Sequence, residues 1–173
     1  CIRDSINGAH DVSVSTIRFT GNEYAVYVED SQRALIDNNE FDLEDYGIYF
    51  TGSSPSATVE YNKFRNATES AIYQSESDEN GASGIHHNTF NDCEVGWQSG
   101  SSSNTFSYNT LKDNSYGIRL TGIESYNNLI DSNSFDDSLV GVFIYNTAYD
   151  NNLFNNEFDD SDNSDIKLTD SSD

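Results

Sequence analysis

The sequence predicts an all-β fold, a coil of short parallel strands that forms a β-helix solenoid of about seven coils of 21–26 residues. Three observations predict it: a repeat of nearly fixed spacing, apolar clusters of strand length, and no sustained helical periodicity. Each repeat has an apolar residue, an Asn three positions later, a Phe two positions after that, and a Gly-Ile step about six positions further on. The clearest copy runs from Ile36 through Asn39 and Phe41 to Gly47-Ile48.

The Asn of the repeat recurs six times. The copies are Asn39, Asn62, Asn88, Asn109, Asn133 and Asn156, separated by 23, 26, 21, 24 and 23 residues. A period of this length is the signature of a solenoid. Copies this short cannot bury an apolar face alone, so they must stack on one another. In an earlier copy, Ile17 stands at the Asn position, so the file of asparagines is expected to begin at Asn39.

The apolar clusters favour strands over helices. Segments such as 47–50, 117–120 and 141–144 are rich in β-branched and aromatic residues and are separated by Asn, Asp, Ser and Gly, which is strand and turn chemistry. No window keeps apolar residues at i, i+3, i+4 and i+7. Equivalent residues of neighbouring parallel coils lie about 4.8 Å apart. Inward Asn amides are therefore expected to hydrogen bond to one another in a ladder.

The N-x-F and G-I pattern resembles the right-handed parallel β-helix family, of the pectin-lyase-like type found in NosD-type proteins, over residues 14–168. The resemblance implies one right-handed β-helix domain over residues 1–173, with residues 1–13 as a partial first coil. It implies no single function, because that superfamily includes lyases, hydrolases, epimerases and surface proteins. Periplasmic metal maturation is suggested by the resemblance alone, and the chain, with no Met, two Cys and three His, lacks the set of Met, Cys and His ligands expected for copper.

The net charge of −22 arises from 30 acidic and 8 basic residues. Such a chain should repel nucleic acid and anionic membranes, so no nucleic-acid partner is expected. Three explanations of the charge remain open: a halophilic habitat in which salt screens the repulsion, a surface that collects divalent cations, and simple solubility. No apolar run is long enough to span a membrane.

The composition of the repeats, rich in Asn, Ser, Thr and Tyr, suits an extracellular or cell-surface location. Cys1 resembles the lipid-anchored start of a processed lipoprotein, with an arbitrary cut site as the alternative. Cys1 and Cys93 lie about four coils apart, which at strand spacing is about 19 Å, so they cannot pair. Cys93 is expected in an outer turn, as a small turn residue or as an inter-chain bond. Asn66 begins a glycosylation sequon, with an ordinary polar turn as the alternative.

An outward column follows the Gly-Ile steps. It reads Tyr27, Tyr49, Tyr73, Gln98, Arg119, Phe143 and Lys167. Exposed rings with cations further along the column can stack on sugars and hold an acidic polysaccharide. The glycan-binding candidates are Tyr27, Tyr49, Tyr73, Arg119 and Phe143. The alternative is aromatic pairing across coils that only stabilises the sheet.

A second outward column follows the Phe. It reads Leu43, Asn66, Asp92, Asp113, Asp137 and Asp160. Calcium could be held between Asp136, Asp137, Asp159 and Asp160 with help from Asp113; a solvated acidic edge is the alternative. Arg119 and Lys167 belong to the other column, so no pectate-lyase role is transferred to them. Strand alternation sends His86 and His87 to opposite faces, so they are not expected to share a metal.

Insertions follow the same strand in each coil and so share one edge, and residues 75–83 are expected to be the most mobile loop. No Ser-His-Asp order, CxxC pair or phosphate loop is present. The sequence therefore predicts a non-catalytic extracellular or cell-surface β-helix with a structural or adhesive role. We expect it to stack end to end with itself or with neighbouring domains, to bind glycan, or both. The alternative is a polysaccharide lyase or hydrolase of the pectin-lyase-like type that acts on acidic polysaccharide at the face formed by the outward column from Tyr27 to Lys167.

Overall fold

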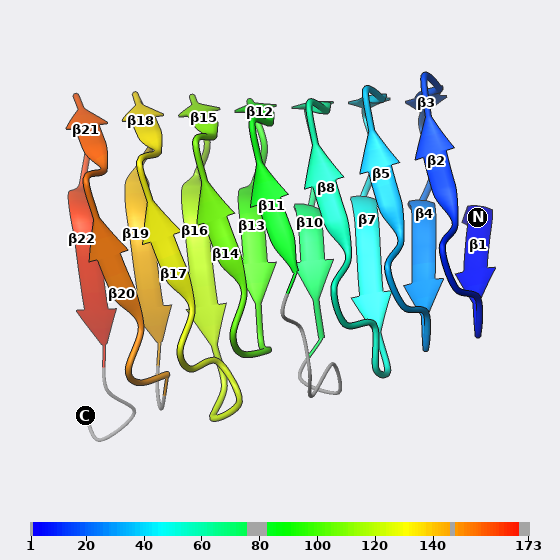
Figure 1. Ribbon diagram of the computed structural model, residues 1–173. Helices are drawn as coiled ribbons and strands as arrows, with labels where there is room; N and C mark the ends of the chain where they lie inside the picture. The colour runs from blue at the N-terminus through cyan, green and yellow to red at the C-terminus, as the bar shows by residue number, and fades with distance from the viewer. Residues whose placement is uncertain (1, 76–82, 146–147, 170–173) are drawn as a thin grey trace.

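The computed structural model describes residues 2–75, 83–145 and 148–169, with side chains described from Asp4 onward. These residues form 22 strands and no helix. All strands pair in parallel and stack as a β-solenoid of about seven turns (Figure 1). The predicted fold class is thereby confirmed. Cys1 and residues 76–82, most of the predicted mobile loop, lie outside the described residues.

The strands form three sheets, so each coil has three sides. The long-strand sheet contains β1 (Ile2–Asn7), β4 (Tyr24–Glu29), β7 (Tyr46–Thr51), β10 (Ser70–Gln74), β13 (Val95–Ser99), β16 (Tyr116–Thr121), β19 (Val140–Tyr145) and β22 (Ser164–Thr169). The second sheet contains β2 (Ser13–Ser15), β5 (Leu35–Asp37), β8 (Thr58–Glu60), β11 (Gly84–His86), β14 (Thr105–Ser107), β17 (Leu129–Asp131) and β20 (Asn152–Phe154). The third sheet contains β3 (Arg18–Thr20), β6 (Glu40–Asp42), β9 (Lys63–Arg65), β12 (Thr89–Asn91), β15 (Thr110–Lys112), β18 (Ser134–Asp136) and β21 (Glu157–Asp159).

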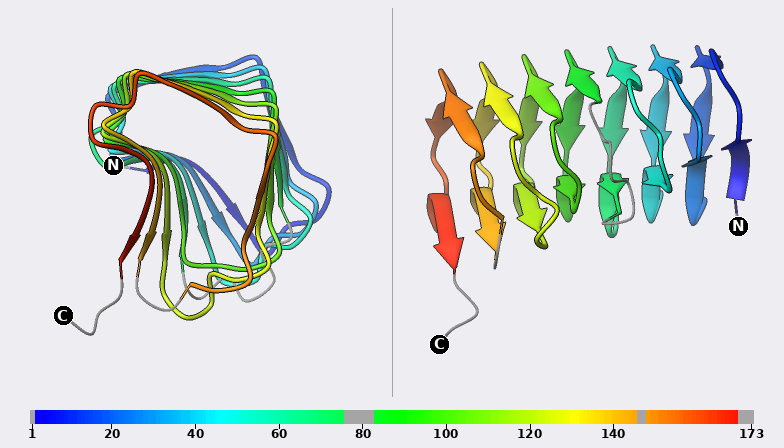
Figure 2. Two further views of the ribbon diagram at one scale, coloured as in Figure 1. Left: turned by 90° about the vertical axis from the view of Figure 1, so that its left-hand side faces the viewer. Right: turned by 60° about the horizontal axis from the view of Figure 1, so that its bottom comes forward.

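Equivalent residues of successive coils are paired in register. Ile72 of β10, for example, pairs with Ile48 on one side and with Trp97 on the other. The end-on view shows the coils superimposed around a common interior (Figure 2). The connections that leave the long strands vary in length, and those that the structure describes in full lie at one edge (Figure 1). Variation in coil length is therefore confined to that edge, and the registers of the three sheets are kept.

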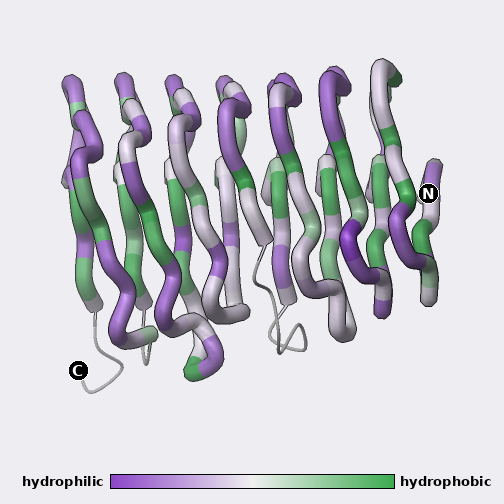
Figure 3. The backbone as a smooth tube through the Cα atoms, viewed as in Figure 1, coloured by the Kyte–Doolittle hydropathy of each residue, from purple (hydrophilic) through white to green (hydrophobic). Residues whose placement is uncertain are grey.

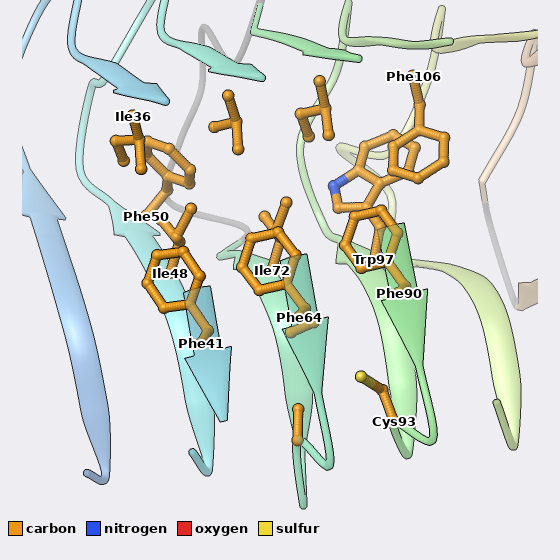
Figure 4. Close-up of a cluster of buried hydrophobic side chains, with 14 of the residues drawn as sticks. Ile36, Phe41, Ile48, Phe50, Phe64, Ile72, Phe90, Cys93, Trp97 and Phe106 are labelled. Atoms are coloured by element: carbon orange, nitrogen blue, oxygen red, sulfur yellow. The ribbon is translucent and has the colours of Figure 1, made fainter. Parts of the chain in front are cut away.

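The interior is filled by columns of identical or similar side chains. Hydrophobic residues recur at the same height in successive coils (Figure 3). Phe41 stacks on Phe64 at 4.6 Å between ring centroids, and Phe64 stacks on Phe90 at 5.0 Å (Figure 4). On its other side Phe41 stacks on Phe19 at 4.9 Å. Leu111 is the register partner of Phe90, so it fills the same column in the next coil. Each ring therefore buries its two faces against its neighbours.

The six asparagines of the repeat lie in one file at the corner between the second and third sheets. Asn88 shows the pattern: its Nδ2 donates to Asn109 Oδ1 at 3.1 Å and to the Val59 carbonyl at 2.9 Å. Its Oδ1 accepts from the backbone N–H of Asn62 at 2.9 Å and from Asn62 Nδ2 at 3.1 Å. The first acceptor of the file is Asn39, whose Oδ1 accepts from the Ile17 N–H at 3.0 Å. Burial of these amides leaves no polar atom unpaired.

Two corners of each coil have a residue in the left-handed conformation. The first corner, between the second and third sheets, has Thr16, Asn38, Tyr61, His87, Tyr108, Ser132 and Asn155, with φ of 50–59°. The second corner, between the third and long-strand sheets, has Gly21, Leu43, Asn66, Asp92, Asp113, Asp137 and Asp160, with φ of 48–69°. Gly, Asn and Asp adopt this conformation at least cost, so they accumulate at the second corner.

Leu43 is the one large apolar side chain at the second corner, with φ of 60° and 57% of its surface exposed. Replacing it with Asn should raise the free energy of unfolding by about 1 kcal/mol, because Asn tolerates this conformation and Leu43 buries little. Urea denaturation followed by circular dichroism measures the change. Asp113→Asn at the same corner is the control and should change the stability little. An unchanged or lower stability of Leu43→Asn would contradict the account.

Candidate functional site

The side chains that follow the Gly-Ile steps form one column on the outer face of the long-strand sheet. Its members pair in register from Tyr27 through Tyr49, Tyr73, Gln98, Arg119 and Phe143 to Lys167. We call this column the stripe. All five glycan-binding candidates lie in it, and none of its seven positions is acidic although acidic residues outnumber basic ones by 30 to 8.

The first half of the stripe is aromatic. Tyr49 stacks on Tyr27 with 5.4 Å between ring centroids and on Tyr73 with 4.8 Å. Tyr24 and Tyr46 contact the edge of the cluster at 5.1 and 5.3 Å from the Tyr49 ring. Burial among these rings raises the pKa of Tyr49 to about 12, so its hydroxyl stays neutral. Our sequence analysis missed Tyr24 and Tyr46, although a Tyr directly before the Ala-Val or Gly-Ile step was a visible signal.

The second half of the stripe lines an open groove of about 500 Å³. The groove is lined by Tyr73, Gln98, Arg119, Thr121, Gly122, Phe143 and Tyr145. The Arg119 guanidinium is held by Nε and Nη2, which donate to Gln98 Oε1 at 3.2 and 2.5 Å. It also lies 5.5 Å from the centroid of the Tyr116 ring.

A second cation lies further along the stripe. Lys167 Nζ is 5.7 Å from the centroid of the Phe143 ring. Among the described residues, Arg18, Arg33 and Lys112 form ion pairs with carboxylates, and Arg119 and Lys167 form none. The same is true of Lys63 and Arg65, but these two pair in register with acidic residues of the neighbouring strand, Glu40 and Asp42. The stripe therefore carries two cations, fixed by polar and aromatic neighbours, whose charge is available to an anion.

The predicted calcium site is not supported. Asp113, Asp137 and Asp160 lie at the second corner, where the left-handed backbone favours Asp without any ligand. Asp136 and Asp137 accept from Lys112 Nζ at 2.5 and 3.4 Å. Over residues 2–75, 83–145 and 148–169, no group of three or more His, Cys, Asp or Glu side chains is arranged to hold a metal ion. Turn geometry and a lysine thus account for the acidic column.

Cys93 is not in an outer turn as predicted. It is 2% exposed and free, and burial raises the pKa of its thiol to about 12. Its backbone N–H donates to Asn114 Oδ1 at 3.0 Å, which places Cys93 at an inward corner. An inter-chain disulfide is therefore incompatible with this position.

Asn66, the first residue of the sequon, is exposed at the second corner, and its Nδ2 donates to Asp42 Oδ1 at 2.9 Å.

Our sequence analysis missed a second file of buried asparagines. Asn104 donates through Nδ2 to Asn128 Oδ1, and Asn128 donates to Asn151 Oδ1, both at 3.0 Å. Asn104 Oδ1 in turn accepts from Gln74 Nε2 at 2.9 Å. Each of these asparagines lies two positions before the apolar residue of its repeat, as Asn128 does before Ile130, so the signal was present in three copies.

The prediction that His86 and His87 face apart is wrong. Their Nδ1 atoms lie 3.1 Å apart. Strand alternation ends at His86, the last residue of β11, and His87 has φ of 56° at the first corner. The left-handed corner turns the second imidazole back toward the first.

Three stacked parallel sheets, an internal asparagine file and short coils define a parallel β-helix repeat protein. A family model described as "Periplasmic copper-binding protein (NosD)" matches residues 2–135 and residues 101–173. The two matches together span nearly the whole chain, which therefore belongs to the NosD family. No curated protein matches the sequence. Within the described residues there is no helix of the length and apolarity needed to cross a membrane.

A copper centre built from soft ligands does not fit the residues present. The sequence has no Met, and the thiol of Cys93 is buried with a raised pKa. Copper(I) prefers thiolate and thioether ligands. The described residues therefore do not form a copper centre of that kind, and the family description alone does not explain what this chain binds.

Proposed function

We propose that this chain is a non-catalytic β-helix on the extracellular or periplasmic side of the cell that binds an anionic polysaccharide along the stripe. The observation that carries the proposal is the pair of cations at the groove and beside it: Arg119 lines the groove, and Lys167 lies next to Phe143 of its lining. Among the described residues neither cation has a carboxylate partner, and the rings beside them, Tyr116 and Phe143, are partly exposed. Because the tyrosine faces of the aromatic half pack on one another, a sugar chain would meet their edges and hydroxyls, which can hydrogen bond to it. A guanidinium binds a carboxylate in a bidentate manner. Together these groups match a chain of acidic sugars.

The spacing of the stripe supports an extended ligand. Ring centroids along its aromatic half are 4.8 and 5.4 Å apart, close to the length of one sugar unit in a polysaccharide. Because the coils repeat at about 4.8 Å, successive sugars can meet equivalent positions of successive coils. Gln98 orients the Arg119 guanidinium before binding, which lowers the entropy lost on binding.

The charge of the chain supports selectivity for this face. With a net charge of −22, most of the surface repels a polyanion. A polyanion is therefore expected to bind at the stripe, where the cations have no carboxylate partner and none of the seven positions is acidic. Salt should weaken binding, because both cations are partly exposed to solvent.

The test is isothermal titration calorimetry of the protein with polygalacturonate oligosaccharides and with neutral glucan oligosaccharides of the same length. We expect the uronate to bind, and Arg119→Ala to weaken its binding by at least about tenfold. The matched control is Arg33→Ala, which removes an exposed arginine that lies away from the stripe. Its Nε is 2.6 Å from Asp11 Oδ1. This variant should leave affinity nearly unchanged. Equal weakening by both variants, or no uronate binding, would refute the proposal.

Incubating the same oligosaccharides with the protein tests the lyase or hydrolase alternative. Chromatography of the products would reveal any shortened chains. Cleavage that is lost in Arg119→Ala would replace the binding proposal with a catalytic one. Intact oligosaccharides that nevertheless bind would support a non-catalytic role.

A further inference from the structure

The first corner between β11 and β12 brings two imidazoles and a carboxylate together. His86 Nδ1 lies 3.1 Å from His87 Nδ1 and 3.5 Å from Glu60 Oε2. Glu60 is the register partner of His86 in the neighbouring strand β8. His86 and Glu60 are about a quarter to a third exposed, with side-chain exposures of 29% and 27%. The cluster is therefore accessible from solvent, and it is separate from the stripe because it lies on another sheet.

Aromatic neighbours fix the orientation of His87. Its ring stacks on Tyr61 at 5.1 Å and on Tyr108 at 5.4 Å between centroids, with interplanar angles of 24° and 16°. All three residues have left-handed backbone conformations, which bulky side chains seldom adopt. The same corner has Asn38 and Asn155 in other coils, so the aromatic residues are not required by the turn. The imidazole is thus held between two rings with its Nδ1 edge toward His86.

We propose that His86 and His87 bind one divalent cation of the zinc class through their Nδ1 atoms. Zinc–imidazole bonds are about 2.0–2.1 Å long, so two nitrogens bound to one tetrahedral zinc ion lie about 3.3 Å apart. The two nitrogens lie slightly closer when the N–Zn–N angle is smaller than the tetrahedral one. The observed 3.1 Å separation is close to this distance, and binding would replace the hydrogen bond between the two Nδ1 atoms by two bonds to the ion. Each neutral ring keeps its proton on Nε2 and directs the Nδ1 lone pair at the ion.

Two protein ligands leave the remaining coordination positions to water, so this is an open site and not a closed structural centre. The Glu60 carboxylate is close enough to neutralise part of the charge or to accept from a bound water. The acidic surface also raises the local concentration of cations. This inference rests on the histidine geometry and not on the proposed glycan binding.

The test follows the histidine ring signals of the full chain by carbon–proton NMR during titration with ZnCl₂. We expect the signals of His86 and His87 to shift together and to saturate at one zinc per chain, while those of His10 stay unchanged. His87→Asn removes a direct ligand and should weaken zinc binding by at least about tenfold, because loss of even an outer-shell partner of a ligand costs about that much. Asn already occupies the first corner at Asn38, so the turn is retained.

Two further variants separate ligand loss from misfolding. His86→Ser should weaken binding to a similar extent, and the register partner Ser107 shows that Ser is compatible with this column. His10→Asn removes the remaining histidine and should leave binding unchanged. Circular dichroism melts check that all three variants fold. The proposal is overturned if His86 and His87 shift only at zinc levels that also shift His10, or if both ligand variants bind zinc as the unmodified chain does.

Discussion

Asn109→Ala should lower the free energy of unfolding by about 3–5 kcal/mol, because it leaves several buried polar groups without partners. Asn109 Oδ1 accepts from the N–H and Nδ2 of Asn88 at 2.9 and 3.1 Å. Its Nδ2 donates to the Ile85 carbonyl at 2.9 Å and to Asn133 Oδ1 at 3.1 Å. Asn109 is only 2% exposed, so water cannot replace these bonds without opening the coil. Urea denaturation followed by circular dichroism measures the loss.

Asn156→Ala is the matched control for the ladder. Asn156 makes the same kind of bonds, to Asn133 and to the Ile130 carbonyl, but it is only partly buried. Water can therefore satisfy some of the freed groups, and we expect a loss of about 1–2 kcal/mol. If the two substitutions cost the same, burial of the asparagine file is not what stabilises the coils.

Trp97→Ala should cost about 3–5 kcal/mol, the range seen when a large aromatic side chain is removed from a core. Trp97 is fully buried, and its ring lies parallel to Phe106 with 4.9 Å between centroids (Figure 4). Its Nε1 donates to Gln74 Oε1 at 2.8 Å, and Gln74 connects to Asn104 of the second asparagine file. Removing the indole therefore creates a cavity and leaves a buried amide oxygen with one partner fewer. Chemical denaturation followed by circular dichroism again gives the change.

Trp97→Phe separates the two contributions. Phenylalanine keeps an aromatic ring against Phe106 but has no N–H for Gln74, so we expect a loss of about 1–3 kcal/mol from the unpaired oxygen. A loss as large as that of Trp97→Ala would mean that the hydrogen bond to Gln74, and not packing, dominates. A loss near zero would mean that Gln74 finds another partner.

The sequence was sufficient for the fold because the repeat acts through strand alternation and coil stacking. Asn39, Phe41 and Ile48 recur at a spacing that only a stack of coils explains, and the structure places their equivalents in register. The stripe follows from the same alternation. In both cases the side chains belong to strands or directly adjoin them. In a strand, successive side chains point to opposite faces, so the position in the sequence decides whether a side chain points into the coil or outward.

Prediction failed where alternation ends. His87 and Asp137 lie at corners with positive φ, and the sequence pattern alone does not reveal that conformation. The imidazole pair was therefore missed, and turn aspartates were interpreted as calcium ligands. The prediction for Cys93 failed for a different reason: it is buried by neighbours from adjacent coils, and a residue near a turn looks exposed when those neighbours are not known.

The asparagine file has a direction. Every Nδ2 from Asn39 to Asn133 donates toward the C-terminal neighbour, so the amide dipoles are aligned head to tail. Each bond polarises the next, which strengthens an aligned chain beyond the sum of its members. The hydrogen bonds between asparagines of neighbouring coils are chemically the same along the file. A whole coil can therefore be duplicated or deleted by recombination and still find matching partners on both sides. Insertion or deletion of half a coil, in contrast, leaves an amide opposite the wrong group. Evolution of such a protein by gain and loss of complete repeats is the expected outcome.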